Sequence, residues 1–336
     1  MRIDVHNHYL PEPYVDLLLD MDTPVGIEAH GDQLYMVHER SGTASVAAGN
    51  EIPLKRGFTD IDERTMWMDE HDIGKTLVSV STPNPLADAF TTDQSTRLVR
   101  AINDGYADDQ SRYSDHIAGL GMLPLREPAE AKTEVDRITD DLDLCGIALP
   151  TSIPGGKLSL PELEPVFDTI DGRGLTVFMH PHGNVLSETL DDSESFLNPL
   201  VVFPIETTLQ VARLIYDGFF DVHDFDVVLS HMGGTLLHLA GRLDRGRREI
   251  DDPDARPDGP ILEYLGDFYY DTISFHRPAL RAAIDTVGVD RFLFGTDYPF
   301  DEEDIDTAVA DIEAVVTSAA DRERIMTTTA QALFDL

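Results

Sequence analysis

Two histidines lie one residue apart near the start of the chain, in the stretch Asp-Val-His-Asn-His that ends with His6 and His8. They follow a short apolar run, residues 2–5, which is typical of a β-strand. Residues i and i+2 of a strand project to the same face, so the two imidazoles could hold one ion between them. The same pattern also fits two solvated histidines on an exposed strand. Whether these two histidines bind an ion therefore depends on which other side chains the fold brings near them.

Further side chains that bind metals or move protons follow three other strand-like runs, at the point where each run ends. His180 follows Val-Phe-Met, His231 follows Val-Val-Leu-Ser, and Asp297 follows Phe-Leu-Phe-Gly-Thr. The carboxyl ends of the strands of a parallel barrel share one face, and active sites are built there. We therefore predict that these three side chains and the two N-terminal histidines form one site.

Three imidazoles and a carboxylate form a donor set that suits Zn²⁺, with water in an open position. The predicted ligands of one zinc ion per subunit, or of another divalent metal, are His6, His8, His180 and Asp297. His231 could be a further ligand, or a base that accepts a proton from metal-bound water, whose pKa zinc lowers to about 7. Residues 145–149, the fourth strand candidate, lack the lysine that bridges two ions in some barrels. Their composition favours a single metal.

The elements that must position these side chains can be read from the apolar pattern. Eight short apolar runs are separated by segments of helical length, which favours an α/β fold of the (β/α)₈ TIM-barrel type over an open sheet. The runs are residues 2–5, 76–80, 117–122, 145–149, 175–179, 226–229, 268–271 and 291–294. Residues 21–58 form an insertion after the first strand, and the alternation at 33–38 predicts that it is a small β-rich flap.

The composition restricts the partners and the compartment. The 336 residues include 63 acidic and only 25 basic ones, for a formal charge of −38. Such a surface repels nucleic acid, and its self-repulsion predicts a halophilic protein of a salt-rich cytoplasm. The apolar runs are too short to cross a membrane, and polar residues interrupt any signal-peptide core. A single cysteine, Cys145, excludes an intrachain disulfide.

Several motifs together resemble the amidohydrolase superfamily in its amidohydrolase-related branch, and within it the aminocarboxymuconate-semialdehyde decarboxylases. They are Asp-Val-His-Asn-His-Tyr-Leu-Pro at 4–11, His-Pro at 180–181, Pro-x-Glu-Thr-Thr at 204–208, Ser-His-Met-Gly-Gly at 230–234 and Gly-Thr-Asp-Tyr-Pro-Phe at 295–300. The resemblance implies one barrel domain over residues 1–336, a single zinc and His231 as the acid/base residue. It also implies that Arg242 binds a substrate carboxylate in the neighbouring subunit of a homodimer.

The chain departs from that family around the substrate. Phe196 and His182 stand where the decarboxylase has tryptophans, and its second substrate arginine has no counterpart in register. We predict substrate contacts for His182 and Phe196, and for His276, which follows the seventh strand candidate. The alternative for the histidines is a loop position outside the pocket. For Arg242 the alternative is a surface arginine paired with Asp244 or Asp252.

Three functions remain compatible with these residues. The first is a zinc-dependent, non-oxidative decarboxylase of a small unsaturated or aromatic carboxylic acid, in which His231 moves a proton and Asp297 holds the metal and relays protons. The second is a metal-dependent hydrolase of a lactone, ester or amide that uses the same residues. The third is a binding protein with a vestigial site, which the full ligand set disfavours.

Overall fold

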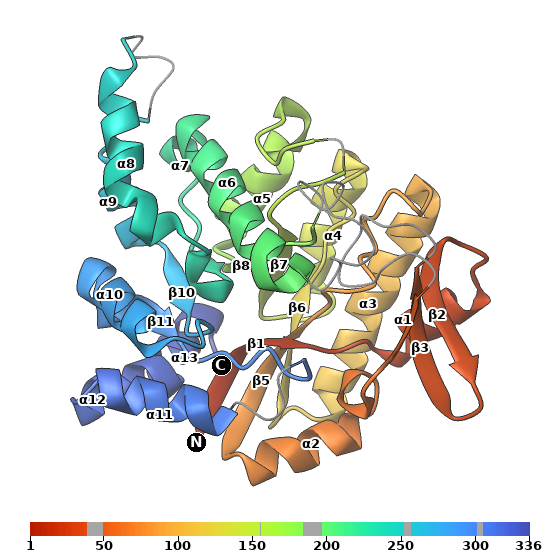
Figure 1. Ribbon diagram of the computed structural model, residues 1–336. Helices are drawn as coiled ribbons and strands as arrows, with labels where there is room; N and C mark the ends of the chain where they lie inside the picture. Colours follow the sequence, from red (N-terminus) through yellow and green to blue (C-terminus); the bar gives the residue numbers. More distant parts are fainter. Residues whose placement is uncertain (39–49, 155, 184–196, 252–256, 301–304) are drawn as a thin grey trace.

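A computed structural model describes residues 1–38, 50–154, 156–183, 197–251, 257–300 and 305–336. Eight parallel strands form one sheet in the order β1-β5-β6-β7-β8-β9-β10-β11 (Figure 1). The strands are β1 Arg2–His8, β5 Ile73–Ser79, β6 Ile117–Gly121, β7 Gly146–Pro150, β8 Val177–His180, β9 Val227–Leu229, β10 Tyr269–Asp271 and β11 Phe292–Leu293. The predicted barrel is confirmed.

Backbone contacts between the first strand and the segment that follows the last strand close the ring. Val5 N–H donates to the Phe294 carbonyl at 3.0 Å, and His8 N–H donates to the Tyr298 carbonyl at 2.7 Å. The first strand β1 continues to His8 instead of ending at the predicted residue 5, because Asn7 and His8 still pair with β5. Both N-terminal histidines therefore lie inside a strand, where alternate side chains share a face.

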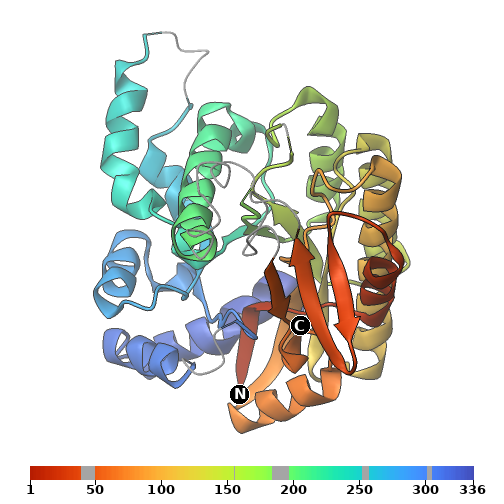
Figure 2. The ribbon, with the colours of Figure 1, turned by 45° about the vertical axis from the view of Figure 1, so that its right-hand side comes forward.

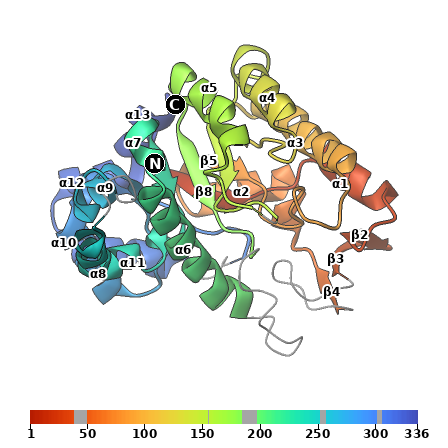
Figure 3. The ribbon, with the colours of Figure 1, turned by 90° about the horizontal axis from the view of Figure 1, so that it is seen from above.

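Helices cover the outside of the sheet, as Figures 1 and 3 show. They are α1 Glu12–Asp20, α2 Ile61–Glu70, α3 Thr92–Arg112, α4 Pro128–Asp140, α5 Glu164–Arg173, α6 Phe203–Tyr216, α7 Phe219–Val222, α8 Leu236–Glu249, α9 Ile261–Asp267, α10 Arg277–Val287, α11 Ile305–Val315, α12 Ala319–Glu323 and α13 Thr329–Phe334. The longest, α3, begins with a capping box in which Thr91 and Gln94 satisfy each other's backbone N–H groups. Its buried face includes Leu98, Val99 and Ile102, at the spacing of an amphipathic helix.

The insertion after the first strand forms a separate three-stranded antiparallel sheet, as predicted. Its strands are β2 Val25–His30, β3 Gln33–His38 and β4 Asn50–Pro53. Figure 2 shows this flap beside the barrel, on the side of α1. Met36 of β3 is buried, and the hydroxyl of Thr82, in the loop after β5, donates to its Sδ at 3.3 Å. The flap thus packs against the end of the barrel at which the strands terminate.

Among the described residues, no helix is both long enough and apolar enough to cross a membrane.

Candidate metal centre

Five side chains from the ends of four strands converge at one end of the barrel. The predicted cluster is His6, His8, His180, His231 and Asp297, and the nitrogen and oxygen atoms of its members form two overlapping groups, each within 4.8 Å, that share His6. The imidazole centroids of neighbouring members lie 4.9 to 5.1 Å apart. Asp297 Oδ1 is 3.0 Å from His8 Nε2 and 3.4 Å from His6 Nε2. Its other oxygen is 4.0 Å from His231 Nε2.

The donor atoms of this cluster fit a divalent metal. His6 Nε2 and His8 Nε2 are buried and have no hydrogen-bond partner with acceptable geometry, although both lie near Asp297 Oδ1. Buried polar atoms are rarely left without a partner, so these nitrogens point to a missing one. Imidazole nitrogens and a carboxylate are ligands of zinc and related divalent metals. The metal would be held by the predicted set of His6, His8, His180 and Asp297.

The ionisation states of His8, His180 and Asp297 suit metal binding, whereas the carboxylates of Asp297 and Asp271 raise the pKa of His6 against the effect of its burial. Burial lowers the pKa of His8 and of His180, which favours the neutral imidazole that coordinates metals. Burial raises the pKa of Asp297, but His6 and His8 outweigh that effect and lower it to about 2. Burial also lowers the pKa of His231 to about 4, so this imidazole is neutral at neutral pH and able to accept a proton.

One carboxylate at the centre was not among the predicted site residues. Asp271 ends β10, is fully buried, and accepts a hydrogen bond from His6 Nδ1 at 2.6 Å. The same carboxylate accepts the backbone N–H groups of His231 at 2.7 Å and Met232 at 2.8 Å. Its position at the end of the seventh predicted strand could have indicated that it belongs to the site, because the barrel places every residue at a strand end on the same face.

A buried arginine holds the end of β1 from outside the cluster. Arg64 of α2 is 1% exposed and donates to Asn7 Oδ1 at 2.9 Å and to the carbonyl of His8. Its guanidinium also lies over the ring of Tyr298, 4.8 Å from the centroid. A cation over an aromatic face is stabilised by the ring quadrupole. Arg64 thus ties the His8 segment to the residue that follows Asp297.

A cavity of about 500 Å³ opens onto the cluster. His8, His180, His231 and Asp297 form part of its lining. The remaining wall is mainly apolar, from Pro199, Leu200, Phe203, Pro204, Met232, Ile273, Phe275, Ala279 and Phe300, with hydroxyls from Ser81, Thr82 and Ser274. The ring of Phe300 meets His8 edge to face at 5.5 Å, and Phe203 meets His180 at 6.0 Å. Such a cavity suits a small, largely apolar molecule with few polar groups.

The four predicted substrate contacts have different positions. His182 is buried behind His180, with Nδ1 2.9 Å from the Ser81 carbonyl, and it does not line the cavity. His276 is exposed at the start of α10, whereas its neighbour Phe275 lines the cavity. Arg242 is exposed on α8, outside the lining, and makes no ion pair within the described part of the chain. Phe196 lies outside the described residues.

Comparisons with known proteins agree on one family. The family model described as Amidohydrolase matches residues 3–336. The gamma-resorcylate decarboxylase of Rhizobium radiobacter is 29% identical over 296 residues, which cover 84% of this chain and 90% of the relative. The 2-amino-3-carboxymuconate-6-semialdehyde decarboxylase of Dictyostelium discoideum is 26% identical over 310 residues, covering 89% and 82% of the two chains.

A solved structure supports the fold. The dihydroxybenzoic acid decarboxylase of a Polaromonas strain, determined with bound manganese and the inhibitor 2-nitroresorcinol, superposes with a TM-score of 0.78. It is 24% identical, and the match covers 100% of this chain and 97% of that one.

Proposed function

The chain belongs to the amidohydrolase family, and from that premise we propose that it is a metal-dependent, non-oxidative decarboxylase of a small unsaturated or aromatic carboxylic acid. The observation that carries the proposal is the cluster of four imidazoles and one carboxylate at the base of an apolar cavity. Both curated relatives described above are named as decarboxylases. The cluster supplies the two parts that such a reaction needs, which are a site for a metal and a group that moves a proton.

The residues divide these two tasks between them. A divalent metal, when bound, supplies positive charge that attracts the substrate carboxylate or a neighbouring oxygen. Phe203 and Phe300 border the cavity and orient an unsaturated ring. The bond between the ring carbon and the carboxylate breaks, CO₂ leaves, and the electron pair stays on the ring carbon. His231, neutral at neutral pH, takes up a proton that comes from water and passes it to that carbon, and Asp297 Oδ2, 4.0 Å from His231 Nε2, relays that proton to the imidazole.

We retain zinc as the proposed metal, at one ion per subunit, because three imidazoles and a carboxylate are a common zinc set. Manganese is the alternative, since a structural neighbour was determined with that ion and carboxylate ligands suit it. Metal analysis of protein purified without added metal tests the choice. The metal that is present at one equivalent and restores turnover after chelation is the native one.

The release of CO₂ tests the proposed reaction. Protein loaded with zinc or manganese, kept in high KCl, is offered a panel of unsaturated and hydroxyaromatic carboxylic acids. We expect CO₂ from at least one acid, and its loss when a chelator removes the metal. Lactones and esters are followed in parallel by proton release. Proton release from a lactone without CO₂ from any acid would contradict the proposal and favour the hydrolase.

The predicted role of Arg242 requires a second copy of the chain, because its side chain is exposed and outside the cavity of its own subunit. We propose a homodimer in which Arg242 meets a second carboxylate of the substrate. We expect Arg242→Ala to lower kcat/KM for dicarboxylic acids by about 10- to 100-fold, since a hydrogen bond to a charged group contributes about 1.5–3 kcal/mol. Monocarboxylic acids should be turned over unchanged.

Arg245→Ala is the matched control for Arg242→Ala, because Arg245 is an exposed arginine of the same helix that pairs with Glu249. Sedimentation of the wild-type protein gives the oligomeric state. A monomer that still turns over dicarboxylic acids would exclude the role of Arg242 in a partner subunit.

The excess of acidic residues supports a further proposal, that the protein works in a salt-rich cytoplasm. The outer helices carry ion pairs such as Arg173 with Asp136 and Asp140, yet acidic residues outnumber basic ones by 63 to 25. The Debye length grows from about 3 Å in 1 M salt to about 30 Å in 0.01 M salt, so repulsion between unpaired acids grows on dialysis. We expect the circular dichroism signal to be lost when multimolar KCl is removed. A full signal in low salt would contradict the halophilic prediction.

A further inference from the structure

The carboxylate of Asp271 is saturated by four N–H donors from three different parts of the barrel. Oδ2 accepts from His6 Nδ1 at 2.6 Å and from the backbone N–H of His231 at 2.7 Å. Oδ1 accepts from the backbone N–H groups of Met232 at 2.8 Å and Ile273 at 3.1 Å. The side chain is 0% exposed, so water does not compete for these bonds. One group thus contacts a predicted metal ligand and the segment that carries the predicted acid/base residue.

The contact with His6 determines which of its nitrogens can bind a metal. A carboxylate oxygen only accepts, so the bond requires a proton on His6 Nδ1. In the neutral imidazole, Nε2 is then without a proton and has a free lone pair. This nitrogen has no hydrogen-bond partner and lies 3.4 Å from Asp297 Oδ1, on the side of the cluster. Asp271 therefore directs His6 Nε2 towards the metal site.

The contacts of Asp271 with the backbone of residues 231–232 stabilise an unfavourable conformation there. His231 has φ 52° and Met232 has φ 54°, both in the left-handed region that residues with a Cβ rarely adopt. A residue with a Cβ is strained in this region, and the conformation persists only when its surroundings enforce it. The N–H groups of these two consecutive residues converge on the two oxygens of Asp271. The carboxylate therefore stabilises the turn that points the His231 imidazole at the cluster.

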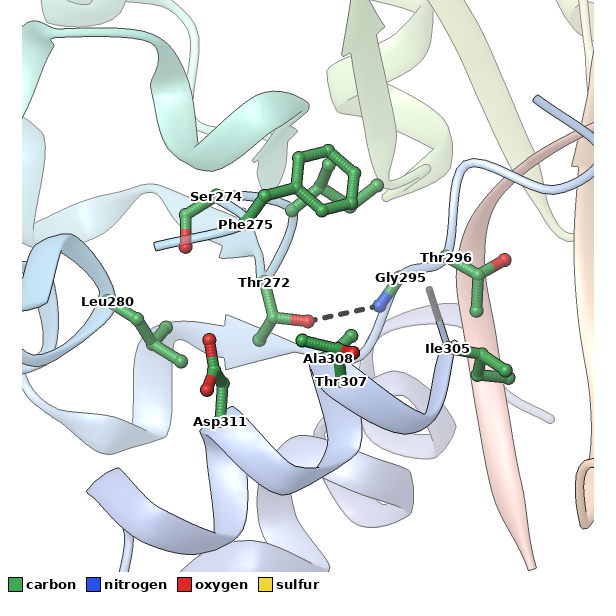
Figure 4. Close-up of a pocket in the computed structure, with 11 residues that line it drawn as sticks. Thr272, Ser274, Phe275, Leu280, Gly295, Thr296, Ile305, Thr307, Ala308 and Asp311 are labelled. Atoms are coloured by element: carbon green, nitrogen blue, oxygen red, sulfur yellow. Dashed lines mark hydrogen bonds between the residues drawn. The ribbon is translucent and has the colours of Figure 1, made fainter. Parts of the chain in front are cut away.

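Neighbouring residues pack closely around Asp271. Gly295 packs against it so closely that an added Cβ would be 3.3 Å from the Asp271 Cβ and 3.0 Å from the His6 Cβ. Thr272, the residue after Asp271, accepts a hydrogen bond from the Gly295 N–H through its hydroxyl at 3.4 Å, as Figure 4 shows. This bond ties the end of β10 to the segment that leads to Asp297. A small displacement of the carboxylate would thus disturb several members of the cluster.

We propose that Asp271 is a positioning residue that couples the metal ligand His6 to the acid/base residue His231. One carboxylate selects the metal-binding nitrogen of the first and orients the imidazole of the second. The part that concerns His231 rests on the proposed decarboxylase function. The part that concerns His6 depends only on metal binding.

Asp271→Asn tests the coupling with little change in size. An amide offers one accepting oxygen, and its NH₂ would face two N–H donors. We expect affinity for zinc to fall by about 10- to 100-fold, as for the loss of other outer partners of a ligand histidine. We expect kcat at saturating metal to fall by a similar factor, and the visible spectrum of the cobalt-substituted protein to change, while KM changes little.

Glu134→Gln is the matched control, because Glu134 is a buried carboxylate that accepts from Asn103 and Arg137 on the outer helices. It should lower the melting temperature and leave the cobalt spectrum and kcat unchanged. If Asp271→Asn behaves in the same way, Asp271 is merely structural and the proposal is wrong.

A measurement on the wild-type protein covers the case in which Asp271→Asn does not fold. In zinc-loaded protein with ¹⁵N-labelled histidine, NMR should find the His6 proton on Nδ1, and a proton on Nε2 would overturn the proposal. Absence of CO₂ from every acid would reject the decarboxylase function alone. The cobalt spectrum and the protonated nitrogen of His6 would still decide whether Asp271 positions the metal ligand.

Discussion

His231→Asn should keep the bound metal and lose turnover by about 100- to 10,000-fold, the usual contribution of a general acid or base. Asparagine fills a similar volume and can form hydrogen bonds, but its amide does not take up a proton near neutral pH. The ligands predicted from the sequence, His6, His8, His180 and Asp297, remain in place in this variant. Steady-state kinetics on the acid that releases CO₂ measures the loss, and metal analysis measures occupancy.

Two outcomes separate catalysis by His231 from a role in metal binding. Loss of both metal and turnover would make His231 a ligand, which the group formed by His6, His180 and His231 allows geometrically. Unchanged turnover would exclude the acid/base role. His238→Asn is the control, because His238 is an exposed histidine of α8 outside the cavity lining.

The convergence of the five side chains could be predicted because each lies within a strand or shortly after one. In a parallel barrel each strand ends at the same face, so a histidine or aspartate after an apolar run is placed by the fold itself. His180 ends β8, and His231 is two residues after β9. His6 and His8 alternate within β1, and their shared face follows from the period of two. Local pattern and fold class were therefore sufficient for these positions.

Asp271 could not be assigned a role from the sequence, for a physical reason. Its contacts with His6 and with the His231 backbone join residues that are 265 and 40 positions apart. A backbone N–H group is the same whatever the side chain, so a sequence motif cannot indicate that a carboxylate accepts hydrogen bonds from it. The left-handed conformation of His231 and Met232 is also not predicted by the sequence, because methionine rarely adopts it and histidine, although enriched there, adopts it only in a minority of cases.

The loop after β10 places Phe275 in the cavity lining and leaves its neighbour His276, a predicted substrate contact, outside it. His276 was predicted to face the substrate from its distance to the strand end. Phe275, the residue before His276, adopts the left-handed φ of 49°. Phe275 then lines the cavity, and His276 is exposed at the first turn of α10. Strand ends are predictable from the alternation of apolar residues, whereas loop directions depend on dihedral angles that the alternation does not specify.

Asp297→Asn is expected to reduce metal affinity by at least about 100-fold and to reduce turnover even when the metal site is full. The first effect follows because a neutral amide attracts a divalent cation far less than a carboxylate of pKa about 2. Loss of a group that only hydrogen-bonds to a metal ligand already lowers metal affinity by about 10- to 100-fold, so loss of a ligand should lower it further. The second follows because Asp297 Oδ2 lies 4.0 Å from His231 Nε2, where it can relay a proton. An amide nitrogen at that position cannot accept one.

Saturating metal separates the two functions of Asp297. Metal affinity is measured by competition with a chelator, and kcat is then measured at full occupancy. Complete recovery of kcat would make Asp297 a metal ligand alone, whereas a residual loss of about 100-fold or more would support the proton relay. Asp171→Asn is the matched control, since Asp171 accepts a hydrogen bond from His223 at 3.0 Å outside the cluster. It removes a charge beside a histidine without touching the metal centre, so it should leave both metal affinity and kcat unchanged.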